Sequence, residues 1–251
     1  MQSRSSERYA LTVDSALPEG ICRPALIWAT SIDAPEPSEQ LAGFATALIH
    51  RVAQAGESFI PLERRQLVRR MLRHGKYRPS GRGKPSSEYL LRAALAGSFP
   101  AVNGPVDVNN TISLESGFPA SIFDVALCGR ELLLRHGLAE ESYVFNKAGQ
   151  SIDLEDLLVV CRRDDAAWVP CGNPVKDSMS TKISSATTDV IAVLYVPADE
   201  PMSLTEQWAC SFAELLQQVC GAVSTGYLVV DEPRSGSGFG LSEEAGDAGC
   251  A

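Results

Sequence analysis

The chain has 251 residues, of which 45% are apolar and 21% charged, so it can bury a core and is not disordered as a whole. No run of about 20 apolar residues occurs, which excludes a membrane-spanning helix. The net charge of −9 argues against a nucleic-acid partner, but the charge is unevenly distributed. Between Arg64 and Arg92 lie ten Lys or Arg and one acid, Glu88, so this segment carries +9 and the remainder −18. Such a segment either presents a basic face to phosphates or is a solvated helix without a partner.

The N-terminal residues show no basic start followed by an apolar core, so we expect no secretory signal. Seven cysteines are widely spaced without a CxxC pair, which favours reduced thiols. We interpret Cys161 and Cys171 as buried apolar side chains, because no histidine lies near them to share a metal. These features predict a cytoplasmic protein that uses neither a metal nor another cofactor.

The first predicted elements are one strand and two helices. Residues 1–8 are polar and are expected to be disordered. Branched and aromatic residues after a proline predict a strand over 23–32. Helical spacing of apolar residues predicts a helix over 38–55 and an amphipathic helix over 60–75, with arginines on its outer face and a glycine at its end.

A basic loop and a third helix follow. The loop, YRPSGRGKP at 77–85, combines glycines and prolines with basic side chains, as phosphate-wrapping loops do, but no nucleotide motif surrounds it. The helix is expected to begin with a cap from Ser86 or Ser87 and to close at Gly97.

A short helix is expected next, with Asp107 as its cap. This places the side-chain amides of Asn109 and Asn110 in the first turn, at the positive end of the helix dipole. Gly117 and Pro119 end the helix. Two amides at a helix start are suited to face a cleft.

The second half of the chain is mostly β. The last helix is predicted over 204–222, capped by Ser203 or Thr205, and a strand over 225–233 follows. The tail, 232–251, is acidic and rich in Gly and Ser, so we expect it to be flexible. Helices followed by strands predict an α+β domain over 9–231. The other predicted strands are short apolar runs at 121–129, 131–137, 142–146, 156–163, 167–172 and 189–197.

Motifs of nucleophilic and metal-dependent hydrolases are absent. The three histidines, His50, His74 and His136, form no HExxH, and the chain contains no GxSxG, no P-loop and no GxGxxG before its tail. An enzyme with this sequence would therefore act by positioning a bound water and hydrogen-bond donors.

The segment VDVNNTISLESGFPASIFD, at 106–124, resembles the B3/B4 domain of the phenylalanyl-tRNA synthetase β-chain. Residues 85–110 look even more like freestanding B3/B4 proteins, and 180–195 resembles the segment that closes the pocket in this family. The resemblance covers about 75–222. It implies an α+β, three-layer fold in which a mixed β-sandwich is flanked by helices, and a pocket that hydrolyses wrongly charged tRNA. The matching positions are Val106, Asp107, Asn110, Leu114, Glu115, Gly117, Pro119, Phe123 and Asp124.

The resemblance also implies site residues. Asn110 matches the family's pocket asparagine, and Asn109 matches a neighbouring threonine or asparagine. Ser121 stands where the synthetase has a histidine, which excludes a simple histidine general base. Met179 aligns with the pocket glutamate by which the synthetase recognises the hydroxyl of tyrosine, so we do not expect this chain to remove tyrosine from tRNA. The nearest acid is Asp177, which would suit a cationic side chain, as would Glu115 if it faced the pocket.

We therefore expect a trans-acting aminoacyl-tRNA deacylase in the cytoplasm, with tRNA rather than DNA as partner and no membrane association. Water would attack the ester, with the terminal ribose hydroxyl as proton partner. The expected catalytic groups are Asn110, Ser121 and Asp177, and the expected substrate pocket adds Asn109, Glu115, Thr181 and Lys176. The expected tRNA-binding residues are Arg65, Arg69, Arg70, Arg73, Lys76, Arg78, Arg82 and Lys84.

Two other functions remain open at this stage. One is a non-catalytic tRNA-binding or RNA-binding module of the same fold, and the other is an amino-acid binder or hydrolase unrelated to RNA. Several site residues also have plain structural interpretations. Asn110 would satisfy backbone groups in a turn, Glu115 would be a surface residue, and Asp124 would hold a turn at a strand end. Lys176 and Asp177 would form an exposed loop pair, and Thr181 and Lys182 would begin a strand.

Overall fold

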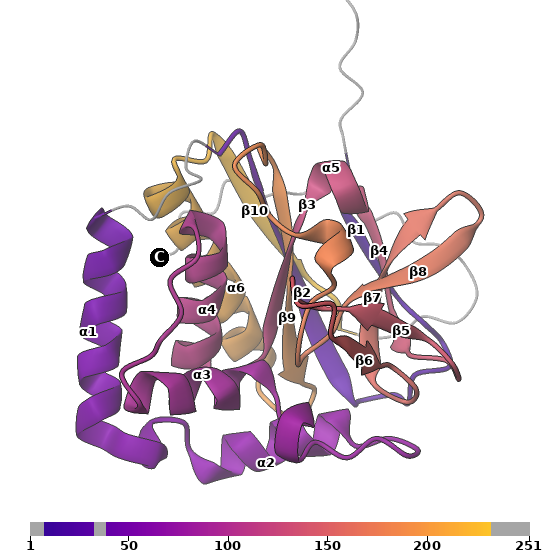
Figure 1. Cartoon of the computed structure of the whole chain (residues 1–251), viewed down its shortest axis with the longest axis horizontal. Helices are drawn as coiled ribbons and strands as arrows, with labels where there is room; N and C mark the ends of the chain where they lie inside the picture. Colours follow the sequence, from indigo (N-terminus) through magenta and orange to yellow (C-terminus); the bar gives the residue numbers. More distant parts are fainter. Residues whose placement is uncertain (1–7, 33–38, 232–251) are drawn as a thin grey trace, which may run out of the picture.

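The computed structural model describes residues 8–32 and 39–231, and Figure 1 shows their arrangement. Of residues 1–8, for which disorder is expected, the structure describes only residue 8. The flexible tail expected over 232–251 lies outside the described residues. The fold is α+β with a mixed β-sandwich flanked by helices, as predicted.

The strands are β1 (Ala10–Val13), β2 (Cys22–Thr30), β3 (Ala120–Asp124), β4 (Glu131–His136), β5 (Ser142–Val144), β6 (Ser151–Asp153), β7 (Leu158–Asp164), β8 (Ala167–Gly172), β9 (Val190–Pro197) and β10 (Ser224–Val229). The helices are α1 (Glu39–Ala55), α2 (Leu62–Leu72), α3 (Ser86–Leu95), α4 (Gly104–Ser116), α5 (Val125–Cys128) and α6 (Met202–Cys220). Short 3₁₀ turns are η1 (Gly56–Phe59), η2 (Gly81–Gly83) and η3 (Met179–Thr181).

Two four-stranded sheets pack face to face. The antiparallel sheet has the order β10-β2-β9-β3, and the other has the order β1-β4-β7-β8, in which β1 is parallel to β4. Helices α4 and α6 cover the outer face of the antiparallel sheet, so that helices, first sheet and second sheet form three layers (Figure 1). Strand β9 is buried at every position because layers cover both of its faces, which explains its unbroken apolar run.

Most predicted elements are confirmed, but the end of α2 and the starts of α3, α4 and α6 differ from the predictions. Helix α2 ends at Leu72, because Arg73 already has extended backbone, rather than continuing to the predicted glycine. Pro85 and Pro201 occupy the N-cap positions of α3 and α6, and neither helix has a side-chain cap. The predicted serine and threonine caps are therefore wrong, and Thr205 is buried within α6 instead. Strands β1 and β6 were not predicted.

Helix α4 begins one turn earlier than predicted. Asn103 is its N-cap, and its side chain accepts a hydrogen bond of 3.1 Å from the backbone N–H of Val106. The carboxylate of Asp107, the predicted cap, accepts a 2.8 Å bond from the N–H of Val102 instead. The two adjacent asparagines therefore lie in the second turn. The C-cap, Gly117, has φ of 78°, as a glycine stop requires.

Five cysteines, Cys22, Cys128, Cys161, Cys171 and Cys220, are free and buried. Among the residues described, no group of three or more His, Cys, Asp or Glu could hold a metal ion. Within the same residues, no helix combines the length and the apolar character that crossing a bilayer requires.

Candidate functional site

A cavity of about 1380 Å³ opens between the loop after α2, helix α3, the β5–β6 hairpin and the segment 175–182. Its acidic side chains are Asp153, Glu155 and Asp177. Basic side chains outnumber them, so the cavity attracts anions even though the whole chain is acidic. The basic residues on its wall are Lys76, Arg78, Arg82, Lys84, Arg92, Lys176 and Lys182.

Hydrogen bonds fix the backbone of the basic loop, 77–85, and of Lys76 just before it. The carboxylate of Asp156 accepts a 2.6 Å hydrogen bond from the backbone N–H of Lys76. A Cβ on Gly75 would lie 2.0 Å from that carboxylate, and its φ of 40° also favours glycine. The hydroxyl of Tyr77 donates to the backbone carbonyl of Gly83, and burial raises the pKa of this tyrosine. The loop therefore presents its cations from a fixed backbone.

Most cations of the cavity are unpaired. Among the described residues, Arg82, Lys84, Arg92 and Lys182 have no ion-pair partner, whereas Lys76 pairs with Glu155 at 2.7 Å. The remaining two cations lie against neutral groups. Arg78 donates to backbone carbonyls, and the ammonium of Lys176 lies 3.9 Å from the centroid of the Phe145 ring. An anionic ligand would therefore meet several cations without first breaking salt bridges.

The floor of the cavity carries a carboxylate, Asp177. Burial raises its pKa from 3.8 to about 6, although the charge of Lys182 and hydrogen bonds from Ser121 and two backbone N–H groups oppose the rise. One of those N–H groups belongs to Asn173, which lies 3.4 Å from the Asp177 carboxylate. The hydroxyl of Ser121 is also 3.0 Å from the hydroxyl of Tyr195. A carboxylate with this pKa is ionised at neutral pH and still able to accept a proton.

The turn that presents Asp177 is organised by Asn173. Its side-chain oxygen accepts 2.8 Å hydrogen bonds from the backbone N–H groups of Val175 and Lys176. Its amide donates to the hydroxyl of Tyr143, which donates in turn to the Lys176 carbonyl at 2.7 Å. No local sequence pattern points to Asn173, Tyr143 or Tyr195, since these residues come from separate strands and loops.

Close packing beneath the carboxylate requires a glycine. A Cβ on Gly172 would lie 2.8 Å from the Asp177 carboxylate and 2.4 Å from the ring of Phe123. No real Cβ approaches another heavy atom this closely, so a larger residue at this position would displace the carboxylate.

The structure brings some of the expected pocket residues together. Lys176 and Asp177 lie on the cavity wall. Ser121 is fully buried beneath Asp177, and Thr181 is buried in η3, where its hydroxyl donates to the Cys171 carbonyl at 3.4 Å. The geometry therefore makes Ser121 and Thr181 supports of the floor rather than surfaces that a substrate touches.

The two asparagines of α4 are separated. Asn109 is buried, and its amide donates to the carbonyl of Ala120 at 3.4 Å, while its side-chain oxygen has no partner. Asn110 is half-exposed and is not among the residues that line the cavity. The expectation that Asn110 faces the pocket is thus not supported, and Asn109 is the one directed towards β3.

Two acids of the matched motif lie apart from the cavity. The carboxylate of Glu115, which was expected in the substrate pocket, pairs with Arg51 of α1 and does not line this cavity. Asp124 caps α5 by accepting a 2.8 Å bond from the N–H of Ala126, and it also accepts from Thr187. The structural interpretation of Asp124, as a residue that holds a turn, is the correct one.

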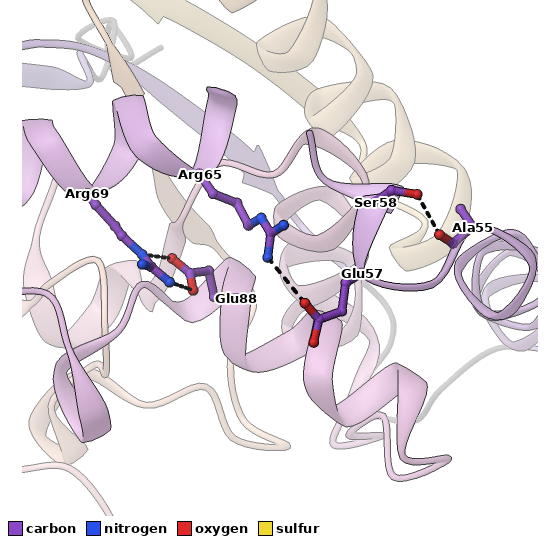
Figure 2. A network of polar contacts seen from close by, with 6 residues as sticks. All are labelled: Ala55, Glu57, Ser58, Arg65, Arg69 and Glu88. Atoms are coloured by element: carbon purple, nitrogen blue, oxygen red, sulfur yellow. Dashed lines mark hydrogen bonds and ion pairs between the residues drawn. The ribbon is translucent and has the colours of Figure 1, made fainter. Parts of the chain in front are cut away.

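The arginines of α2 mostly bind other parts of the same chain. Figure 2 shows the guanidinium of Arg69 holding both carboxylate oxygens of Glu88 on α3, and Arg65 directed towards Glu57 of η1, at 4.0 Å. Arg70 likewise pairs with Asp199 at 2.7 Å. Of the four arginines in or just after α2 that were expected to bind tRNA, Arg73, the C-cap residue, is the one that is exposed without an ion-pair partner in the described residues. The residues expected to bind tRNA therefore form two groups. Most arginines of α2 form ion pairs within the chain, whereas the cations of the basic loop line the cavity.

The chain matches the model of a known family. The family model of the B3/4 domain matches residues 78–205, just over half of the chain. The match begins within the basic loop and includes α3, α4, β3 and the turn that presents Asp177. No curated protein matches the chain.

Proposed function

The chain belongs to the B3/4 domain family, and on this premise we propose that it is a trans-acting aminoacyl-tRNA deacylase whose active centre is the cavity above Asp177. The observation that carries the proposal is the carboxylate itself, with its pKa raised to about 6 at the floor of a cavity whose wall is mainly cationic. A polyanionic substrate with a reactive ester suits both features.

Hydrolysis in this cavity needs one held water. Asp177 accepts a proton from the water while the water oxygen bonds to the ester carbonyl carbon. The ammonium of Lys182, on the same wall, stabilises the negative charge that develops on the carbonyl oxygen. The ester C–O bond then breaks, and the proton passes from Asp177 to the ribose oxygen. The products are the free amino acid and a tRNA with its terminal hydroxyl restored.

The polar groups beneath the floor position the base. The backbone N–H of Asn173 donates to the Asp177 carboxylate, while the Ser121 hydroxyl donates to the Asn173 carbonyl at 3.3 Å and lies 3.0 Å from the Tyr195 hydroxyl. Because Ser121 is fully buried and bonded to Asn173, it supports the turn that carries Asp177 and is not a nucleophile. A histidine base is unnecessary in this arrangement.

The cations of the loop and of α3 bind the RNA backbone. Arg82, Lys84 and Arg92 are available because each lacks an ion-pair partner among the described residues. Two other cations of the cavity, Lys176 and Lys182, lie near Asp177 and disfavour a positively charged amino-acid side chain there. A neutral or acidic aminoacyl group fits the cavity better than the cationic one that an isolated acid would suit.

The test is a panel of tRNAs, each charged with a non-cognate amino acid, incubated with the purified protein while ester loss is followed. We expect one or more substrates to turn over, and Asp177→Asn to lower the rate on them by about 100-fold or more. Asp165→Asn is the matched control, because Asp165 is an exposed acid in the β7–β8 turn, outside the cavity. Its φ of 50° suits asparagine equally well. Absence of turnover across the panel would refute the proposal.

One observation favours a second candidate, a tRNA-binding module that has lost catalysis. Asn110, the residue that matches the family's pocket asparagine, lies off the cavity wall. This candidate predicts salt-sensitive tRNA binding by the wild-type protein without ester loss.

A further inference from the structure

Helix α3 presents a tyrosine and an arginine to the cavity. Tyr89 and Arg92 are three residues apart, so they lie on the same face of the helix, and both line the cavity wall. The opposite face is occupied by Leu90, Leu91, Ala93 and Ala94, which are buried. The two residues that face the cavity therefore contribute little to the core.

Tyr89 is open to solvent at the mouth of the cavity. Its side chain is 58% exposed, and among the described residues its hydroxyl has no hydrogen-bond partner. An aromatic ring left open beside an unpaired guanidinium provides a flat apolar face and a positive charge together. This is the combination by which proteins bind unpaired nucleobases and the phosphates next to them.

The two other aromatic residues of the cavity, Tyr77 and Phe145, differ from Tyr89 in being half-buried. Phe145 is half-buried, and the ammonium of Lys176 already lies 3.9 Å from its centroid. One face of the Phe145 ring is thus covered by a cation of the protein itself. Among the aromatic side chains of the cavity, Tyr89 is the most exposed and the best placed for stacking.

We propose that Tyr89 is a stacking platform for an unpaired nucleobase and that Arg92 binds the adjacent phosphate. The site consequently takes single-stranded RNA and not a duplex, because bases within a duplex are stacked on each other and cannot cover the tyrosine ring. This inference rests on the proposed function for the assignment of RNA as the partner. It adds which part of an RNA enters the cavity and which residue recognises it.

The experiment measures binding by fluorescence anisotropy with two probes, an unstructured RNA of about 12 nucleotides and a blunt-ended hairpin. We expect wild-type protein to bind the unstructured RNA more tightly than the hairpin. Tyr89→Ala should weaken binding of the unstructured RNA by about fivefold or more, whereas Tyr89→Phe, which keeps the ring, should stay within about twofold of wild type. Val102→Ala is the matched control, because Val102 has the same exposed fraction of 58% and lies outside the cavity.

Unchanged binding by Tyr89→Ala, equal binding of the two probes, or absence of RNA binding by the wild-type protein would each overturn the inference. The experiment separates this inference from the deacylase proposal. If Tyr89 is needed for binding but no ester is hydrolysed, the stacking platform stands and the enzyme does not. If esters are hydrolysed but Tyr89→Ala binds RNA normally, the reverse holds.

Discussion

Replacing Arg69 by alanine leaves the Glu88 carboxylate without the two donors that it holds in Figure 2. Glu88 is 6% exposed, whereas the side chain of Arg69 is 37% exposed. Breaking a fully buried pair costs about 3–5 kcal/mol, and an exposed pair contributes about 0–1 kcal/mol. Because one partner of this pair is buried and the other is partly exposed to solvent, we expect a value between these limits, so that Arg69→Ala lowers the free energy of unfolding by about 2 kcal/mol.

Urea unfolding followed by circular dichroism measures this loss, and a double-mutant cycle with Glu88→Ala isolates the part due to the pair. RNA binding by the folded variant should remain within about twofold of wild type, because the stability loss does not alter the cavity. The control, Arg82→Ala, should show the opposite pattern. Its stability should be unchanged, its RNA binding weaker, and the salt dependence of that binding smaller by an amount that corresponds to about one phosphate contact. If Arg69→Ala lost RNA binding without losing stability, the structural role of Arg69 would be refuted, and α2 would be part of the RNA-binding surface.

The remaining predictions concern pH. The rate of ester hydrolysis should rise with pH up to about 6 and then level, because the pKa of Asp177 is raised to about 6 and only the ionised form accepts a proton; a pH profile without this inflection would exclude Asp177 as the base. Burial and the stacked ring of His74, 3.7 Å away, lower the pKa of His136 from 6.5 to about 4, although Asp14 and Asp156 oppose this. Unfolded protein therefore takes up the proton first, so unfolding free energy should fall by about 1–2 kcal/mol between pH 6.5 and 4. His136→Phe should remove that part of the acid sensitivity, as urea titrations at both pH values would detect.

The elements that the sequence predicted well are those whose signal is local. The apolar run of β9 and the αL glycine after α4 each determine their structure within a few residues. The predicted caps of α3 and α6 failed because a proline occupies each N-cap position, and the cap of α4 failed because two polar candidates lie close together. Asn103 and Asp107 are both good cap residues, and the one that precedes a glycine and a proline begins the helix.

The site was predicted only in part, for two physical reasons. Adjacent helical residues point about 100° apart, so one of two consecutive asparagines must turn away from a given neighbour, and the sequence does not say which. The α2 arginines looked free because their partners lie far along the chain, as Asp199 does from Arg70. Asp177 and Lys176, by contrast, were identified through the family resemblance and do lie on the cavity wall.

The central claim is that the aminoacyl ester is hydrolysed in the cavity above Asp177. A crystal structure with a non-hydrolysable 3′-aminoacylamino-adenosine analogue tests it most directly. We expect the aminoacyl carbonyl carbon to lie above Asp177, with one water about 3 Å from both the carboxylate and that carbon, and the adenosine to lie on the side of α3. An analogue bound elsewhere, or with its carbonyl directed away from Asp177, would contradict the account.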